Sequence, residues 1–244
     1  MIDLHVHVLP GLDDGPQTLE ESVGMCRLAA ADGVKAMVAT PHQQHEEWEN
    51  TNVAEIMRLC HEVEAAASGV VRILPGGEVR ASMGIPADLE RGEPGGLIPL
   101  AGSRYVLVEP SPFPFAPSLE ELVYELGVAG WRTILAHPER YGYLAEETER
   151  LRVLVKRGAL LQVTAASVLG ANGRRAEAAA RYLLQHRLAH FLASDGHDCH
   201  GRAPLLANAA RFVASHWGED LAQTLILGNP QAVIENRELP LEAS

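Results

Sequence analysis

The sequence has little of three features that mark common classes of protein. It contains three cysteines, 5% aromatic residues, and 20 basic against 32 acidic side chains, which gives a formal net charge of −12. A negative chain is repelled by nucleic acid and anionic membranes, and few aromatic rings are available to stack on bases. No apolar run approaches the roughly 18 residues of a membrane-spanning helix. We therefore expect neither a nucleic-acid partner nor insertion into a membrane.

The cysteines exclude one kind of catalysis. Cys26, Cys60 and Cys199 are odd in number and far apart, which argues against a disulfide framework and for a reducing compartment. A phosphatase of the Cys-x5-Arg type needs an arginine six residues after its cysteine to hold the phosphate. The residues at those positions are Asp32, Ala66 and Leu205. A thiolate nucleophile of this kind is therefore excluded.

The length and composition favour one folded domain. A chain of 244 residues with 47% apolar side chains can bury a sizeable core, and it suits one large domain or two small ones. No linker, low-complexity stretch or short repeat divides it, so we expect a single domain over residues 1–244. Asp3 stands where a secretory signal would carry basic residues, which favours a cytoplasmic location.

Short strand-like runs alternate with helix-like segments along the chain. The runs are Ile2–Val8, Val34–Ala39, Val70–Leu74, Tyr105–Val108, Arg132–Ala136, Ala159–Val163 and Ala189–Ala193. Two helices should begin at capping boxes, Thr18 with Glu21 and Ser118 with Glu121. We expect an ordered loop over Pro110–Pro117, between a strand and the second of these helices. Such alternation is typical of α/β folds with parallel strands.

Polar residues capable of binding metal follow the predicted strands. They are His5, His7, Asp14, His42, Glu78, Glu109, His137, Asp195 and His197. All except Asp14 lie at the C-terminal end of a predicted strand or within a few residues of it. In a barrel these ends meet at one face, where metals and substrates bind, whereas an open sheet would spread them along a line. We therefore predict a seven-stranded (β/α) barrel rather than an open sheet.

The first strand carries the sharpest local signal. Side chains alternate across a strand, so His5 and His7 should share one face with Asp3. The apolar residues should occupy the other face, namely Ile2, Leu4, Val6 and Val8. Two imidazoles at this spacing can chelate one ion, although by themselves they could also be a pair of buried core histidines. Asp195 and His197 repeat the spacing at the last strand, which favours the metal site.

Six motifs taken together resemble a known family. They are His5-Val6-His7, Leu12-Asp13-Asp14-Gly15, Ala39-Thr40-Pro41-His42, Leu74-Pro75-Gly76-Gly77-Glu78, Ala136-His137-Pro138-Glu139-Arg140 and Ala193-Ser194-Asp195-Gly196-His197, with Gly228-Asn229-Pro230 near the end. In this order they resemble the polymerase-and-histidinol-phosphatase (PHP) superfamily, and more closely its bacterial capsular-polysaccharide tyrosine-phosphatase branch. One departure is Pro110 after Glu109, where a bulky residue is expected, which puts the direction of Glu109 in question.

The resemblance implies a distorted (β/α)7 TIM-like barrel of PHP type holding three divalent ions. One ion would take His5, His7, Glu78 and Asp195; the second Glu78, Glu109 and His137; the third Asp14, His42 and His197. Glu78 would then bridge two ions. An imidazole and carboxylate set without thiolate suits manganese, which we favour, and also iron, zinc or magnesium.

Two arginines are candidates for binding phosphate. Arg140 follows His137 and Arg202 follows His197, so both should lie in loops of the active face. A guanidinium matches phosphate with two parallel hydrogen bonds, and the resemblance gives both residues this catalytic role; each could otherwise form a surface ion pair. His45 and His200 lie close to proposed ligands, so they are either contacts of the site or ordinary loop residues.

The resemblance also implies the reaction and a partner. The reaction would be metal-dependent hydrolysis of phosphotyrosine, and the partner would be the phosphorylated tyrosine tail of a bacterial autokinase that controls capsular or exopolysaccharide synthesis. A small-molecule phosphatase, for example one acting on histidinol phosphate, would use the same ions in a narrower pocket. A non-catalytic metal-binding scaffold would retain the barrel and lose some ligands, but here all nine positions are filled.

Overall fold

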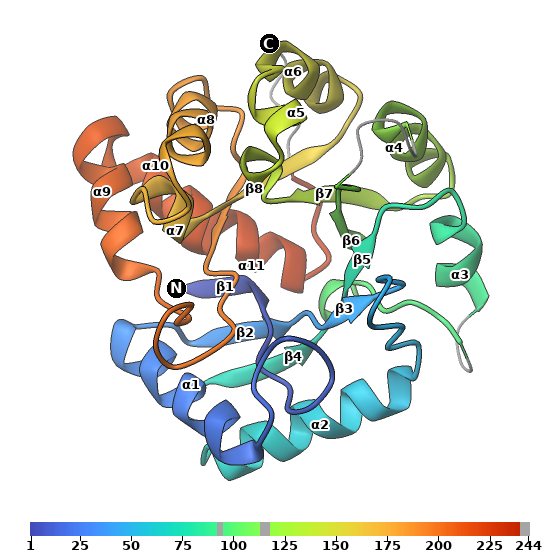
Figure 1. Ribbon diagram of the computed structural model, residues 1–244, viewed down its shortest axis with the longest axis vertical. Helices are drawn as coiled ribbons and strands as arrows, with labels where there is room; N and C mark the ends of the chain where they lie inside the picture. The colour runs from blue at the N-terminus through green and yellow to red at the C-terminus, as the bar shows by residue number, and fades with distance from the viewer. Residues whose placement is uncertain (92–94, 113–117, 240–244) are drawn as a thin grey trace.

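The structure, a computed structural model, describes residues 1–91, 95–112 and 118–239, and it is an α/β fold in which short strands alternate with helices (Figure 1). The strands are β1 (Ile2–Val6), β2 (Ala36–Ala39), β3 (His42–Gln43), β4 (Arg72–Pro75), β5 (Glu78–Arg80), β6 (Tyr105–Glu109), β7 (Arg132–Ala136), β8 (Leu160–Thr164) and β9 (Phe191–Ala193). The seven predicted strands are confirmed with ends within two residues of those observed. The very short β3 and β5 were not predicted.

All strand pairs are parallel, and they form two sheets. One has the order β1-β2-β4 and the other the order β3-β5-β6-β7-β8-β9. The short β3 and β5 continue the direction of β2 and β4, since Ala39 pairs with Pro75 and, a few residues later, His42 pairs with Glu78. A bridge between Val6 and Gly196 joins the end of β1 to the segment after β9.

Helices surround the strands (Figure 1). They are α1 (Leu19–Asp32), α2 (Val53–Ala66), α3 (Ile85–Arg91), α4 (Leu119–Val128), α5 (Gly142–Ala145), α6 (Thr148–Lys156), α7 (Ala165–Val168), α8 (Arg174–Gln185), α9 (Ala207–Trp217), α10 (Glu219–Gln223) and α11 (Asn229–Ile234). Two short 3-10 helices, η1 (Leu100–Gly102) and η2 (Pro138–Arg140), and a π-helical segment, η3 (Thr224–Gly228), complete the set among the described residues. The capping box of Thr18 and Glu21 is confirmed at α1, and the Ser118 hydroxyl accepts from the backbone N–H of Glu121 at α4. Residues 113–117 of the predicted Pro110–Pro117 loop lie outside the described residues. Within the described ranges, no helix is long and apolar enough to cross a membrane.

Two hydrophobic clusters lie on the two sides of the strands. The outer cluster joins alternate strand residues to the helices, for example Val106 and Val108 of β6. The inner cluster contains the residues between them, such as Tyr105 and Leu107, and it is covered by Val233 of α11. Because Glu109 continues the series of Tyr105 and Leu107, the end of β6 turns a carboxylate toward the inner side.

The first strand does not alternate as predicted. Ile2 and Leu4 pack in the inner cluster, but Val6 and Val8 pack in the outer one. The pairing of β1 with β2 shifts register between Asp3 and Val6, and this irregularity changes the faces of the residues that follow. The prediction that all four apolar residues share one face was therefore wrong.

Candidate metal centre

The structure brings together the nine side chains that the sequence singled out. They come from the ends of β1 and β6, from β3 and β5, and from the segments that follow β1, β7 and β9. Eight of the nine are buried, and Asp14 is the exposed member. We call these nine residues the cluster: His5, His7, Asp14, His42, Glu78, Glu109, His137, Asp195 and His197.

Glu78 lies at the middle of the cluster. Its Oε2 is 3.2 Å from His5 Nε2, 3.3 Å from His7 Nε2 and 3.2 Å from His42 Nδ1. Its Oε1 is 2.9 Å from His137 Nε2. Burial by itself would raise the pKa of Glu78, but the neighbouring imidazoles hold it well below its usual value. The carboxylate therefore remains ionised although it is fully buried.

The two histidines of the first strand converge as chelating ligands would. His5 Nε2 and His7 Nε2 are 3.2 Å apart, and Asp195 Oδ1 lies 3.4 and 3.7 Å from them. The other ring nitrogens are held from behind, His5 Nδ1 by Gln162 Oε1 at 2.9 Å and His7 Nδ1 by Asp13 Oδ2 at 2.7 Å. These contacts leave both Nε2 atoms facing the common point.

Asp13 and Gln162 are two further side chains of the site, and no sequence pattern predicted a role for either of them. Asp13 also accepts hydrogen bonds from the backbone N–H groups of Gly15 and His42, at 3.0 Å each, so it ties the loop after β1 to β3. Gln162 is a polar side chain in the middle of a fully buried strand. A polar residue at such a position was the available signal, since a buried amide needs a partner.

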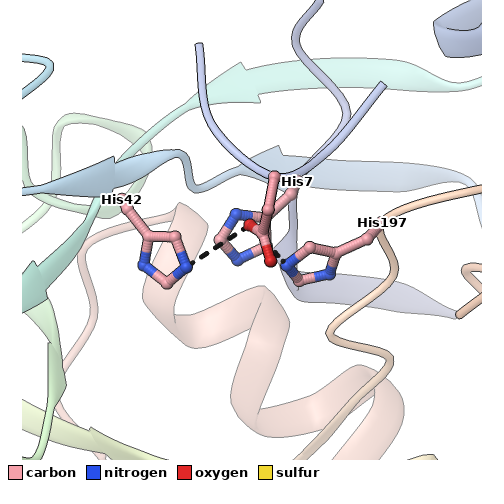
Figure 2. A group of neighbouring side chains, drawn as sticks. His7, His42 and His197 are labelled. Atoms are coloured by element: carbon pink, nitrogen blue, oxygen red, sulfur yellow. Dashed lines mark ion pairs between the residues drawn. The ribbon is translucent and has the colours of Figure 1, made fainter. Parts of the chain in front are cut away.

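Three imidazoles lie around Asp14, the exposed member of the cluster. Figure 2 shows His7, His42 and His197 from separate segments, with dashed lines for the ion pairs that Asp14 Oδ1 makes with His197 Nε2 at 3.1 Å and His42 Nε2 at 3.6 Å. The rings of His7 and His197 stack with centroids 3.9 Å apart. The exposed carboxylate of Asp14 thus opens this end of the cluster to solvent.

Glu109 faces the cluster in spite of Pro110. Its Oε2 is 3.6 Å from His42 Nδ1 and 3.2 Å from Arg80 Nη2, and its Oε1 accepts from Tyr141 Oη at 2.8 Å. Burial and the nearby charge of Glu78 raise the pKa of Glu109. The contacts of Arg80 and Tyr141 with Glu109 were not predicted, because neither residue belongs to a motif that indicates contact with a carboxylate.

Asp195 and His137 adopt backbone conformations that few non-glycine residues accept. Their φ values are +54° and +32°, in the left-handed region. Such conformations cost about 1–3 kcal/mol each and persist where the surrounding structure enforces them. Asp3 helps to hold the backbone next to Asp195, because its buried carboxylate accepts hydrogen bonds from Ser194 N at 3.1 Å and from the Ser194 hydroxyl. Burial raises the pKa of Asp3 to about 6.

Both predicted arginines reach the cluster from its open side. Arg140 Nη1 forms an ion pair with Asp195 Oδ2. Arg202 Nη2 is 3.2 Å from the same oxygen, and its Nη1 is 3.2 Å from Asp14 Oδ2. Their side chains are 36% and 40% exposed, so each can also meet a ligand arriving from solvent. Both line a cavity of about 300 Å³ that the cluster shares with His45.

The other two histidines in question differ in position. His45 lies 4.9 Å from the ring of His42, centroid to centroid, and lines the cavity of the cluster. His200 is exposed and lines a neighbouring cavity of about 410 Å³, which shares Arg140, Asp195 and Arg202 with the cavity of the cluster. The cluster therefore has one accessory imidazole beside it and one further away.

The donor set fits divalent metal ions. Among the described residues, both oxygens of Glu78, Oε2 of Glu109 and Nε2 of His197 are buried and form no hydrogen bond, although each has an ion-pair contact at 2.9–3.2 Å. Buried polar atoms without partners are costly unless an ion or water satisfies them. Ligand atoms within 4.8 Å of one another form four overlapping groups: His7, Asp14, His42 and His197; His5, His137 and Asp195; His5, His7 and Glu78; and His42, Glu78 and Glu109.

The cysteines take no part in this centre. Cys26 and Cys60 are buried, and burial raises the pKa of each thiol to about 12. Burial also raises the pKa of Cys199, whose Sγ contacts the carbonyl of Glu21 at 3.6 Å. These thiols are protonated at neutral pH, which agrees with the exclusion of cysteine catalysis.

The fold and the cluster together define a parallel α/β protein with a buried imidazole–carboxylate centre able to hold metal ions. The family model described as capsular polysaccharide synthesis, CpsB/CapC, matches residues 1–235. The chain belongs to this family.

Individual proteins resemble the chain over nearly its whole length. It is 32% identical to tyrosine-protein phosphatase YwqE of Bacillus subtilis strain 168, over 99% of this chain and 91% of that protein. A solved structure from work on YwqE of B. subtilis and CpsB of Streptococcus pneumoniae, described as unique metal-dependent tyrosine phosphatases, matches with a TM-score of 0.90 and 29% identity, over 98% of this chain and 96% of the other. Histidinol phosphate phosphatase of Lactococcus lactis, solved with zinc, L-histidinol and phosphate, matches with a TM-score of 0.52 and 14% identity, over 88% and 94% of the chains, which is a likeness of fold.

Proposed function

We propose that this protein is a metal-dependent protein-tyrosine phosphatase, a phosphoric monoester hydrolase. The observation that carries the proposal is the cluster itself, nine imidazole and carboxylate side chains of which six line one cavity together with two arginines. Membership of the CpsB/CapC family and the resemblance to YwqE support the same activity and a context of capsular polysaccharide synthesis.

The cluster would hold three divalent ions, with manganese favoured over iron, zinc and magnesium. We assign His5, His7, Glu78 and Asp195 to the first ion, Glu78, Glu109 and His137 to the second, and Asp14, His42 and His197 to the third. The four imidazole contacts of Glu78 support its position as the bridge. When bound, such ions activate water as a nucleophile and offset the negative charge of the phosphoryl oxygens.

The remaining residues would orient the reaction. Arg140 and Arg202 would bind the phosphoryl group from the open side, where both guanidinium groups reach solvent. Asp13 and Gln162 hold the imidazoles of His7 and His5 in their ligating orientation. Phenolate is a better leaving group than an aliphatic alkoxide, which lowers the demand for a general acid.

The chain would form one domain over residues 1–244 with the geometry of a distorted seven-stranded barrel. In this arrangement β3 and β5 extend β2 and β4, and the last strand meets the first. Hydrogen bonds from Asp195 N to His5 O at 2.9 Å and from His7 N to Gly196 O at 2.8 Å support that closure. The nine residues of the cluster, which come from β1, β3, β5 and β6 and from the segments after β1, β7 and β9, would then share one face.

We propose that the substrate is a phosphotyrosine protein in the cytoplasm, with the phosphorylated tyrosine tail of a bacterial autokinase as the partner. Open access at Asp14 supports a protein substrate, because a flexible tail can bring a phosphotyrosine side chain to that end of the cluster. Nucleic acid and membrane lipid have no place in this proposal.

The decisive experiment is turnover of a phosphotyrosine peptide and of histidinol phosphate after metal reconstitution. We expect hydrolysis of the peptide, loss of activity with a chelator, and most of the activity retained in Cys199→Ser. Preference for histidinol phosphate would favour the small-molecule alternative. Metal binding without turnover of either substrate would favour the scaffold, and loss of activity in Cys199→Ser with resistance to chelation would refute metal catalysis.

A further inference from the structure

One wall of the cluster's cavity is aromatic. The indole of Trp48 stacks on the imidazole of His42, with ring centroids 5.3 Å apart and planes 10° apart. His45 lies against both, 4.9 Å from His42 and 4.8 Å from Trp48 between centroids. Trp48 and His45 line the same cavity as Arg140 and Arg202. An aromatic surface therefore lies within the space that contains the cationic side chains.

This aromatic wall is held by its own turn. The backbone N–H of His45 donates to the carbonyl of Trp48 at 3.0 Å. The Asn50 side-chain amide donates to the carbonyls of His42 at 2.8 Å and Leu12 at 2.9 Å. These bonds fix the loop to β3 and to the loop after β1, so the indole is positioned before any ligand arrives. A preorganised surface avoids the entropy cost of ordering on binding.

We propose that Trp48 and His45 form an aryl shelf that receives the phenyl ring of an aryl phosphomonoester while its phosphoryl group lies at the cluster. This inference rests on the proposed phosphatase function and identifies what would select an aromatic leaving group. Nothing in an imidazole–carboxylate–arginine site distinguishes phosphotyrosine from an aliphatic phosphate, because all of these groups contact the phosphoryl end. A second aromatic ring beside Trp48 gains contact that an alkyl group does not.

The neighbouring cavity offers a different environment. It shares Arg140 and Arg202 with the cavity of the cluster, has a volume of about 410 Å³, and takes its apolar character from aliphatic side chains such as Leu169 and Leu205. Within the described part of the chain, none of its lining residues is phenylalanine, tyrosine or tryptophan. Leu205 thus provides a matched control, an apolar residue that lines the neighbouring cavity but not the cavity of the cluster.

The test is calorimetric binding of phenylphosphonate and methylphosphonate to the metal-loaded protein. Wild type should bind the phenyl compound more tightly. Trp48→Ala should weaken the binding of phenylphosphonate about 3- to 10-fold, which is the contribution of one aromatic pair contact, and should leave the affinity for methylphosphonate unchanged. Trp48→Phe should keep most of the preference, His45→Ala should lose part of it, and Leu205→Ala should keep all of it.

The outcomes separate the shelf from the proposed function. Equal binding of the two phosphonates by wild type, or an unchanged preference in both Trp48→Ala and His45→Ala, would overturn the shelf. Loss of the preference in Leu205→Ala would also overturn it, since the ring would then lie in the neighbouring cavity. If Trp48→Ala fails to fold by circular dichroism, His45→Ala and Trp48→Phe decide. Failure of wild type to hydrolyse a phosphotyrosine peptide would refute the proposed function, whatever the binding preference.

Discussion

At the scale of single residues, Glu78 is the carboxylate that contacts four imidazoles of the cluster. Four imidazoles face its two oxygens at 2.9–3.3 Å, and it is fully buried. An ionised carboxylate among several imidazoles supplies negative charge to a group of nitrogen donors, and this charge attracts cations to the site. A neutral amide of the same shape would keep the packing and lose that charge.

We therefore expect Glu78→Gln to lose most of its bound metal and most of its activity. The substitution removes a charge that the proposed assignment shares between two ions. Metal content by elemental analysis and turnover of a phosphotyrosine peptide measure the effect. Glu47→Gln is the control, because Glu47 lines the same cavity but is exposed and outside the cluster. Full metal content together with wild-type turnover in Glu78→Gln would show that Glu78 is no bridge.

The arginines make the complementary prediction. Arg140→Ala and Arg202→Ala should retain metal content but lose about 30- to 1000-fold in turnover, since a bidentate charged contact in a partly dry site contributes roughly 2–4 kcal/mol in the transition state. Lysine at either position should restore activity only in part. Inorganic phosphate should inhibit both variants more weakly than wild type. Arg58→Ala, on the exposed face of α2, should behave as wild type; unchanged turnover and phosphate inhibition in the site variants would make both residues ordinary surface arginines.

At the scale of elements, the loop after β1 is as important as the strand. Asp13 accepts from His7 Nδ1 and from two backbone N–H groups, one of them at His42 in β3. Burial would raise the pKa of Asp13, but His7 holds it below its usual value. One carboxylate thus joins two segments that carry residues of the cluster, strand β3 and the loop after β1, and sets the orientation of an imidazole.

Asp13→Asn should reduce metal affinity about 10- to 100-fold, the usual loss when the partner behind a ligating histidine is changed. Titration of the metal-free protein with Mn²⁺ measures it. Asp32→Asn is the matched control, because Asp32 also accepts from two backbone N–H groups, those of Leu206 and Ala207, away from the cluster. Asp32→Asn should lower the free energy of unfolding without changing the affinity for metal. Equal metal affinities for wild type and Asp13→Asn would contradict the positioning role.

At the scale of the whole molecule, the free energy of unfolding should depend on pH through His190, a histidine outside the cluster. His190 precedes β9, its Nδ1 accepts from Leu161 N at 3.1 Å, and burial lowers its pKa to about 4. The unfolded chain, with an ordinary pKa near 6.5, then binds more protons than the folded chain between about pH 4 and 6.5. The contribution of His190 to stability is complete above that window and is lost as the pH falls through it.

His190→Asn should therefore flatten the pH dependence of the unfolding free energy between pH 4 and 6.5, by up to about 1.4 kcal/mol per pH unit. Asparagine can accept from Leu161 N through its side-chain oxygen but does not titrate. Urea denaturation of the metal-free protein at several pH values gives the slopes. His216→Asn, on the exposed end of α9, should leave the slope as it is. Parallel curves for wild type and His190→Asn would show that His190 makes no such contribution.

The sequence alone determined the alternation of strands and helices and the identity of the cluster residues, because both depend on local patterns: apolar spacing, capping residues, and motifs at strand ends. The tertiary structure decided the rest. It made β3 and β5 strands, which are too short to have a period of their own. It also turned Val6 away from Leu4 through a register shift that depends on pairing with β2.

The contacts that orient the cluster also belong to the tertiary structure. His5 meets Gln162 across 157 residues, and Asp3 meets Ser194 across 191. Trp48 stacks on His42 only because the turn after β3 folds back. Such pairings arise when strands and loops distant in the chain pack together, and no local periodicity encodes them. The residues of the cluster could therefore be predicted from residue types and their order, whereas the directions of their side chains depended on the packing of the whole chain.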